Sequence, residues 1–188
     1  MYRTRVGYTG GDKEFPTYQS LGNHTESVQI DFDENVVSYE ELLDLFFAYH
    51  NPHSQPYSQQ YKSAIYYANE AQKLSAEKKK GALEEETGTT VYTEILPVET
   101  FYIAEAYHHK YYLRKVTLLV QELEEKYPTL DAFLDAPSVT SINGYVFGCR
   151  SIEDLLEDLP SFQLSLESEE TLKDIVKKHN FQAVCTTD

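Results

Sequence analysis

The sequence predicts a mixed α/β fold, built as a two-layer sandwich and followed by a helical C-terminal extension. Two observations carry this prediction. Short runs of alternating or β-branched residues predict strands, and they lie at residues 3–8, 26–32, 61–67 and 90–96. Helical patterns separate the later strands, and the strand–helix–strand–helix–strand order favours a mixed-sheet sandwich over a doubly wound fold.

The first half of the chain carries clear start and stop signals. A Gly-Gly pair at residues 10–11 ends the first strand, because glycine adopts backbone angles that other residues avoid. Ser38, three residues before Glu41, forms a capping box that predicts a helix over residues 39–50. Asn69 predicts the start of a second, charged helix.

The second half is predicted to be mostly helical. Residues 101–126 have a helical pattern, in which an aromatic-rich start and the apolar run 116–120 blur the break between elements. Residues 129–134 predict a short helix, and residues 169–179 a last, strongly charged one. Ser151 predicts the start of another short helix. The glycine-containing stretch 142–149 predicts a loop or a short strand.

Composition and charge exclude several classes of partner. The net charge of −15 argues against nucleic acids and anionic membrane surfaces, which require basic patches. No apolar run reaches the length of a transmembrane helix, and no signal peptide is visible. The two cysteines, Cys149 and Cys185, form neither a disulfide framework nor a zinc pattern. A reduced, cytoplasmic setting is therefore expected.

The candidate site residues are one acid and several tyrosines. Glu26 has the strand parity of Val28 and Ile30, which predicts a carboxyl facing the apolar side and a neutral acid able to protonate an oxygen. The alternative is that Glu26 lies just outside the strand and is solvated. Tyr18 and Tyr61 lie beside proline and polar loops, where two hydroxyls converging with an acid would bind a polarised S=O group. The alternative is that they are core tyrosines.

An ordered set of motifs extends this interpretation. The segments are Val6-Gly-Tyr-Thr-Gly-Gly11, Pro16-Thr-Tyr18, His24-Thr-Glu26, Ser38-Tyr-Glu-Glu-Leu-Leu43, His50-Asn-Pro52, Gln60-Tyr-Lys-Ser-Ala-Ile65 and Ala104-Glu-Ala-Tyr-His108. In order and approximate spacing, this set resembles the A-class peptide methionine sulfoxide reductases. The resemblance predicts a family domain over residues 1–136, with residues 137–188 as the C-terminal extension.

The resemblance implies roles for individual residues. The acid of the family pocket falls on Glu26, and the two oxygen-binding tyrosines fall on Tyr18 and Tyr61. In that family a cysteine thiolate attacks the sulfur of methionine-(S)-sulfoxide in proteins. A second thiol then forms a disulfide that thioredoxin, or another thiol, reduces. No bound cofactor or metal is implied.

The chain departs from the family at the nucleophile. In the family, a Gly-Cys-Phe-Trp motif lies before the strand that corresponds to residues 3–8 of this chain. This sequence lacks that motif and contains no tryptophan. We therefore expect the family's first strand and its nucleophile to be missing, and this chain to be inactive as given. Cys149 and Cys185 are candidates for resolving thiols.

Three hypotheses follow from these observations. The chain is a reductase whose N-terminal segment lies outside this sequence, a non-catalytic relative that binds methionine sulfoxide or a peptide, or an interaction domain that acts through its acidic C-terminal third. Two further classes of site are disfavoured. Glu105 and His108 are spaced like half of a di-iron site, but the sequence has no second copy of that motif. The stretch Gly7 to Gly11 lacks the lysine and the following helix of a phosphate loop.

Overall fold

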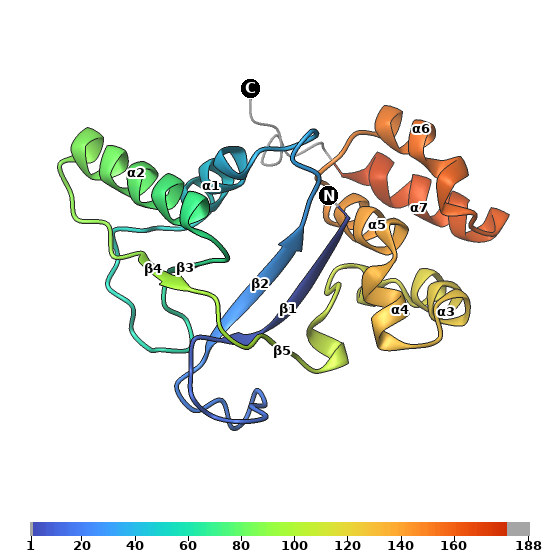
Figure 1. The fold of residues 1–188 in the computed structure, drawn as a ribbon. Coiled ribbons are helices and arrows are strands. Elements are labelled where there is room, and N and C mark those ends of the chain that lie inside the picture. The colour runs from blue at the N-terminus through green and yellow to red at the C-terminus, as the bar shows by residue number, and fades with distance from the viewer. Residues whose placement is uncertain (1, 180–188) are drawn as a thin grey trace. The chain divides into compact units, whose positions relative to one another are not determined.

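The computed structural model describes residues 2–179, which fall into two compact units. Residues 6–105 form one of them, here called the strand unit. The described residues of 1–5 and 106–188 form the other, here called the helical unit. Figure 1 traces both along the chain.

The strand unit contains two small sheets, and only the first three residues of their strand β1 (Arg3–Thr9) are assigned to the helical unit. Strands β1, β2 (Thr25–Asp31) and β5 (Tyr102–Ile103) form a three-stranded sheet in the order β2-β1-β5. β1 and β5 are antiparallel, with Tyr8 opposite Tyr102. Strands β3 (Ala64–Tyr67) and β4 (Glu94–Pro97) form a parallel pair, with Ile65 opposite Ile95. The β1–β5 pair is thus antiparallel and the β3–β4 pair, in the other sheet, is parallel.

Two helices belong to the strand unit, α1 (Tyr39–Ala48) and α2 (Glu70–Thr87), and both lie close to the β3–β4 pair (Figure 1). Ser38 and Glu41 form the predicted capping box, with the Glu41 N–H donating to Ser38 Oγ at 3.2 Å. The side chain of Asn69 caps α2. A small apolar cluster joins these elements: Leu43, Phe47, Ile65, Ala76 and Val91.

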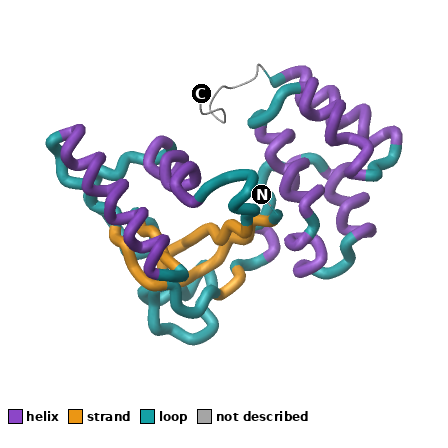
Figure 2. The backbone as a smooth tube through the Cα atoms, turned by 45° about the horizontal axis from the view of Figure 1, so that its top comes forward, coloured by secondary structure: helices purple, strands orange, loops and turns teal. Residues whose placement is uncertain are grey.

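The helical unit contains the remaining described helices, drawn in purple in Figure 2. They are the 3₁₀ turns η1 (Ala106–His108) and η2 (Leu113–Lys115), and the α-helices α3 (Thr117–Lys126), α4 (Leu130–Asp135), α5 (Pro137–Phe147), α6 (Ile152–Phe162) and α7 (Leu166–Lys178). One continuous core joins η2 and the five α-helices, with Leu119, Leu134 and Leu155 fully buried. The mixed α/β class and the helical C-terminal extension are confirmed.

Two predictions in the second half need correction. The helical pattern expected over 101–126, with its blurred break, corresponds to β5, two 3₁₀ turns and α3, so its first residues form a strand rather than a helix. Tyr102 pairs with β1, and Lys110 has a φ of 54°, which an α-helix does not allow.

Residues 142–149, expected to be a loop or a strand, lie largely within α5. Val139, Ile142 and Val146 are buried on one face of this helix, so its packing outweighs the weak propensity of Gly144. Gly148 ends the helix with a φ of 98°, a conformation that favours glycine.

Two other features bear on the sequence predictions. The boundary expected at residue 136 marks the end of the family resemblance. The division into two compact units does not test that boundary, so it stays a prediction. None of the helices among residues 2–179 is long and apolar enough to cross a membrane.

Candidate functional site

The three candidate residues converge within the strand unit, with Gln60 between them. Tyr61 Oη lies 3.4 Å from Tyr18 Oη, so the two phenols meet directly. Gln60 Nε2 donates to Glu26 Oε1 at 2.5 Å and to Tyr61 Oη at 3.0 Å. The group Tyr18, Glu26, Gln60 and Tyr61 is called the phenol–acid site below.

Tyr18 lies in the loop between β1 and β2. Thr17 and Ser20 exchange two backbone hydrogen bonds around it, which closes a tight turn. The Tyr18 N–H donates to Glu105 Oε1 at 3.0 Å, and Tyr8 Oη donates to Glu105 Oε2 at 2.6 Å. Tyr8 is buried in β1, so Glu105 connects the Tyr18 turn to the sheet.

Glu26 lies within β2 and is half-buried. The alternation of β2 predicted that Glu26 shares a buried, apolar face with Val28. That prediction is wrong, because Val28 is 59% exposed. The alternative of a fully solvated residue outside the strand is also wrong. Its backbone N–H donates to Gln60 O at 3.0 Å, which fixes Glu26 against the segment before β3.

Tyr61 precedes β3 and is 45% exposed. Its hydrogen bond with Tyr18, its partial burial and the nearby Glu26 charge together raise the pKa of Tyr61 to about 12. The phenol therefore carries its proton throughout the physiological range. The ring of Tyr57 lies beside Tyr61, with centroids 5.6 Å apart. The prediction of core tyrosines is wrong for Tyr18 and Tyr61, since both are exposed.

His24 holds the glycine turn in place at one side of the site. The Gly11 N–H donates to His24 Nδ1 at 3.1 Å, so Nδ1 is an acceptor and the proton lies on Nε2. Nε2 then donates to Lys13 O at 2.8 Å. Because both ring nitrogens are engaged and the ring is 1% exposed, His24 stabilises the loop rather than reacting. A Cβ at residue 11 would clash with the His24 backbone, which accounts for glycine there.

Gln60 and Glu105 are site residues that the sequence analysis did not assign. Both lie in segments that it quoted, next to Tyr61 and in the motif compared with a di-iron site. Among residues 2–179, no group of three or more His, Cys, Asp or Glu side chains is placed to hold a metal ion. Glu105 instead accepts hydrogen bonds from the Tyr18 turn and from Tyr8.

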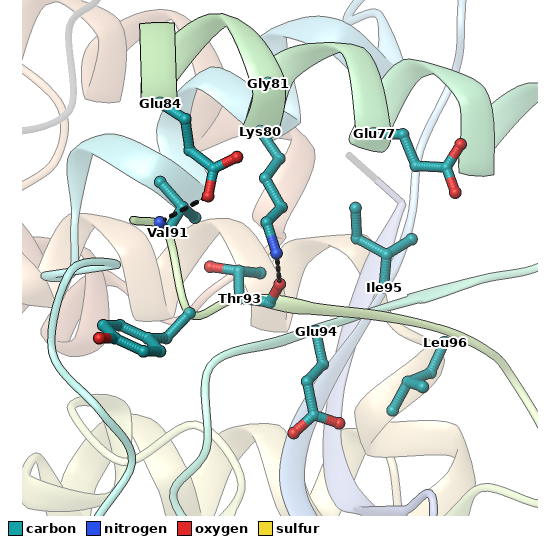
Figure 3. A pocket seen from close by; sticks show the side chains of 10 residues that line it. Glu77, Lys80, Gly81, Glu84, Val91, Thr93, Glu94, Ile95 and Leu96 are labelled. Atoms are coloured by element: carbon teal, nitrogen blue, oxygen red, sulfur yellow. Dashed lines mark hydrogen bonds between the residues drawn. The ribbon is translucent and has the colours of Figure 1, made fainter. Parts of the chain in front are cut away.

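A separate cavity of about 580 Å³ lies between α2 and β4 (Figure 3). Lys80 Nζ donates to Thr93 O at 2.8 Å, and Glu84 Oε1 accepts from the Val91 N–H at 2.8 Å. The polar groups at its floor therefore bind the protein itself. None of the four phenol–acid residues lines this cavity.

Cys149 follows α5 and is disulfide-bonded in the structure. The sequence analysis expected a reduced thiol at Cys149, and the structure has a disulfide-bonded sulfur there instead. A disulfide sulfur carries no thiolate and cannot attack a sulfoxide. Cys185 lies outside the described residues.

The phenol–acid site has the chemistry of an oxygen-binding site on a mixed α/β scaffold. Two phenols and a carboxyl group can converge on one acceptor oxygen, and the amide of Gln60 fixes two of these three groups. Such an arrangement of phenols, a carboxyl group and an amide is suited to contacting an oxygen that accepts hydrogen bonds.

Comparison with known proteins gives the family. A sequence profile of the family "Peptide methionine sulfoxide reductase" matches residues 1–134. The chain belongs to this family.

Individual relatives agree with the profile. The chain is 39% identical to a peptide methionine sulfoxide reductase of Drosophila melanogaster over 167 residues, covering 88% of this chain and 67% of that protein. It is 41% identical over 117 residues to the peptide methionine sulfoxide reductase MsrA of Pasteurella multocida, covering 57% of this chain and 67% of that one. The fly match is long enough to continue into the helical segment after residue 136.

Solved structures are similar in fold. Methionine sulfoxide reductase A of Corynebacterium diphtheriae aligns with a TM-score of 0.51 and 32% identity, over 61% of this chain and 64% of that one. Mxr1 of Saccharomyces cerevisiae in its reduced form aligns with a TM-score of 0.53 and 26% identity, over 56% and 66%. The chain thus spans about two thirds of the length of these relatives.

Proposed function

We propose that the protein acts in thiol-dependent reduction of methionine-(S)-sulfoxide in proteins, a repair of oxidative damage, and that its own phenol–acid site holds the sulfoxide oxygen. The carrying observation is the convergence of Tyr18, Glu26 and Tyr61 around Gln60. A sulfoxide oxygen is a strong acceptor with no proton to donate. Phenolic O–H groups and a protonated carboxyl group are suitable donors to it.

The proposed chemistry divides between two sides of the substrate. The phenol–acid site binds the oxygen and supplies a proton to it as the S–O bond breaks. A thiolate attacks the sulfur, takes the oxygen as a sulfenic acid and releases methionine. A second thiol displaces water to form a disulfide, and a thioredoxin-like dithiol reduces that disulfide.

The residues of this chain support only the oxygen side of this scheme. The sequence has two cysteines, and neither lies in a Gly-Cys-Phe-Trp motif. Cys149 follows Gly148 but precedes Arg150, and Cys185 precedes Thr186. Cys149 is disulfide-bonded, which fits a resolving thiol, the role we assign also to Cys185. We therefore propose that this chain by itself binds the sulfoxide without reducing it. A cytoplasmic location remains part of the proposal, because transient redox disulfides also occur inside cells.

A binding and turnover assay tests the proposal. The purified chain is titrated with N-acetyl-methionine-(S)-sulfoxide in ¹H–¹⁵N NMR, with the (R)-sulfoxide and N-acetyl-methionine as controls. Shifts at Tyr18, Glu26 and Tyr61 with the (S)-sulfoxide are expected, and no shifts with the thioether. Equal responses to all three compounds would refute an oxygen-binding site.

Turnover is measured on the same samples with dithiothreitol, by the release of N-acetyl-methionine. The expected rate is that of dithiothreitol alone. Faster turnover would contradict the proposed inactivity and point to Cys149 or Cys185 as the nucleophile.

The second candidate function is a non-catalytic relative that binds methionine sulfoxide or a peptide. The favouring observation is the same: an oxygen site with no thiolate among the described residues. The transcript sequence upstream of the Met1 codon separates the two functions. An in-frame Gly-Cys-Phe-Trp motif supports the reductase, whereas a stop codon directly upstream supports the binding protein.

A further inference from the structure

Gln60 occupies the centre of the phenol–acid site. A glutamine amide has two N–H donors, and Gln60 Nε2 is within donating distance of both Glu26 Oε1 (2.5 Å) and Tyr61 Oη (3.0 Å). One side chain therefore contacts both the acid and one of the phenols. Gln60 is half-buried, which limits the competition from water for these hydrogen bonds.

The backbone around Gln60 fixes this arrangement. The Glu26 N–H donates to Gln60 O at 3.0 Å, so the two residues are joined through the main chain as well as through their side chains. One residue earlier on each segment, Thr25 Oγ1 donates to Gln59 O at 3.1 Å. These bonds set the register between the start of β2 and the segment before β3. Gln60 is thus held opposite Glu26 in the free protein.

The amide also sets the direction of the Tyr61 hydroxyl. A phenol has one O–H to donate and can accept through its oxygen. Because Gln60 donates to Tyr61 Oη, the proton of that hydroxyl points away from the amide, toward solvent or a neighbouring acceptor. The neighbouring oxygen is Tyr18 Oη, at a long 3.4 Å, so this contact is weak and easily replaced.

We infer that Gln60 is a positioning residue for sulfoxide binding: its amide holds Glu26 beside Tyr61 and presents the Tyr61 hydroxyl proton to the bound oxygen. This inference rests on the proposed function. It further specifies the ligand group, because an oxygen that accepts hydrogen bonds suits a site arranged in this way, and a thioether, which lacks that oxygen, does not.

Three variants test the inference by NMR titration with N-acetyl-methionine-(S)-sulfoxide. Gln60→Ala removes both donors, and affinity is expected to fall about fivefold to tenfold. Gln60→Glu keeps the shape but places a carboxylate beside Glu26, and a larger loss is expected at pH 7. Gln55→Ala is the matched control, since Gln55 Nε2 donates to Tyr92 Oη at 3.3 Å in the same unit. Its affinity is expected within twofold of the parent protein.

A pH series separates positioning from loss of structure. The groups facing residue 60 are Glu26, Tyr61, Tyr18 and, through the ring of Tyr61, Tyr57. As the pH falls from 7 to 4.5, the added carboxyl of Gln60→Glu gains a proton and can donate to Glu26. The affinity of Gln60→Glu should therefore approach that of the parent protein as the pH falls. The affinity of Gln60→Ala relative to the parent protein should not change with pH. A merely structural defect would not recover in this way.

A ligand-free readout keeps the inference separate from the proposed function. The ¹³Cζ resonance of Tyr61 reports the hydrogen bonding of its oxygen, and it should shift in Gln60→Ala but not in Gln55→Ala. If the parent protein fails to bind the sulfoxide, the proposed function fails, and this resonance still decides whether Gln60 orients Tyr61. Unchanged affinity or an unchanged Tyr61 resonance in a folded Gln60→Ala variant would overturn the inference.

Discussion

The helical unit and the strand unit are stabilised in different ways. Among residues 2–179, the helical unit buries fifteen residues in one continuous apolar cluster. The strand unit has two separate clusters, of five and three buried residues. Exposed tyrosines occur in both units, and those of the strand unit include Tyr18, Tyr57 and Tyr61. Burial contributes most of the stability where the core is continuous. The strand unit depends more on hydrogen bonds between loops, and those same bonds assemble the phenol–acid site.

The largest expected effect concerns the two cores. Leu155 is fully buried in the large cluster, and Leu155→Ala should lower the free energy of unfolding of the helical unit by about 3 kcal/mol. Leu43 is 4% exposed in the five-residue cluster, where neighbouring side chains can relax into the space left by the truncation. Leu43→Ala should therefore lower the free energy of unfolding of the strand unit by about 2 kcal/mol. Hydrogen exchange, resolved by residue, reports each unit separately. Equal losses of protection would show that the cores do not differ.

The second prediction compares one tyrosine hydroxyl in each unit. Tyr145 is buried and donates to Asp158 Oδ2 at 2.8 Å, so Tyr145→Phe should destabilise the helical unit by about 2 kcal/mol. Tyr61 is 45% exposed, and Tyr61→Phe should change stability by less than about 0.5 kcal/mol. Sulfoxide affinity should show the reverse order, with Tyr61→Phe about fivefold weaker and Tyr145→Phe unchanged.

Thermal unfolding and NMR titration of the same two proteins check both halves of that prediction. A Tyr61→Phe variant that loses stability but keeps its affinity would assign Tyr61 to the fold. A Tyr145→Phe variant with weakened affinity would mean that the two units do not divide these roles.

The sequence predicted local elements well where one residue type dictates the geometry. Ser38 with Glu41, Asn69 and Ser151 marked helix starts that the structure contains, because a cap depends on residues within one turn. The prediction failed where distant packing decides. The short strand β5 exists through its pairing with β1, and α5 exists because its apolar face enters the large core. Neither partner is visible within the local sequence window.

The candidate site shows the same division. Tyr18, Glu26 and Tyr61 could be named from motifs, and the structure brings these three residues together. The position of Gln60 between them could not be predicted, since it depends on the register between β2 and the segment before β3. The parity argument for Glu26 failed for a related reason. It assumed a buried face, and Val28 shows that this face of β2 is not covered within the strand unit.

The third prediction concerns a charge inside the helical unit. Lys110 is 6% exposed, and burial lowers the pKa of its amine to about 8. An unfolded lysine has a pKa of about 10.4, so between about pH 8 and 10.4 the unfolded chain binds more protons. Stability should therefore rise with pH across that window, by at most about 1.4 kcal/mol per pH unit, and be lost as pH falls through 8. The Lys110 Nζ donates to Thr4 O, Thr4 Oγ1 and Thr140 Oγ1 within the same unit.

Denaturant unfolding at several pH values measures this slope. Lys110→Met should abolish it, because the titrating group is gone. Lys178→Met, at an exposed position at the end of α7, is the control and should keep it. A parent protein whose stability is flat from pH 8 to 10 would show that the Lys110 amine stays charged in the fold.

The smallest expected effect comes from the helix caps. Comparing one cap in each unit tests whether caps contribute equally to stability in the two units although the cores differ. Among the described residues, each unit has one capping box, Ser38 with Glu41 before α1 and Ser151 with Asp154 before α6. A cap acts within its own first turn, so Ser38→Ala and Ser151→Ala should each cost about 1 kcal/mol despite the different cores. Hydrogen bonds from the Ser38 N–H and hydroxyl lower the pKa of Glu41, and those from the Ser151 hydroxyl and N–H lower the pKa of Asp154.

Because each carboxyl has a lowered pKa in the folded state, the contribution of the box is present at neutral pH and is lost as pH falls through the folded pKa. In each alanine variant the pKa of the paired carboxyl should rise toward its ordinary value, which ¹³C NMR of the carboxyl carbon measures. Matching losses in the two variants would confine the difference between the units to their cores and long-range contacts. A much larger loss for Ser38→Ala would instead mean that the small α1 core depends on its cap.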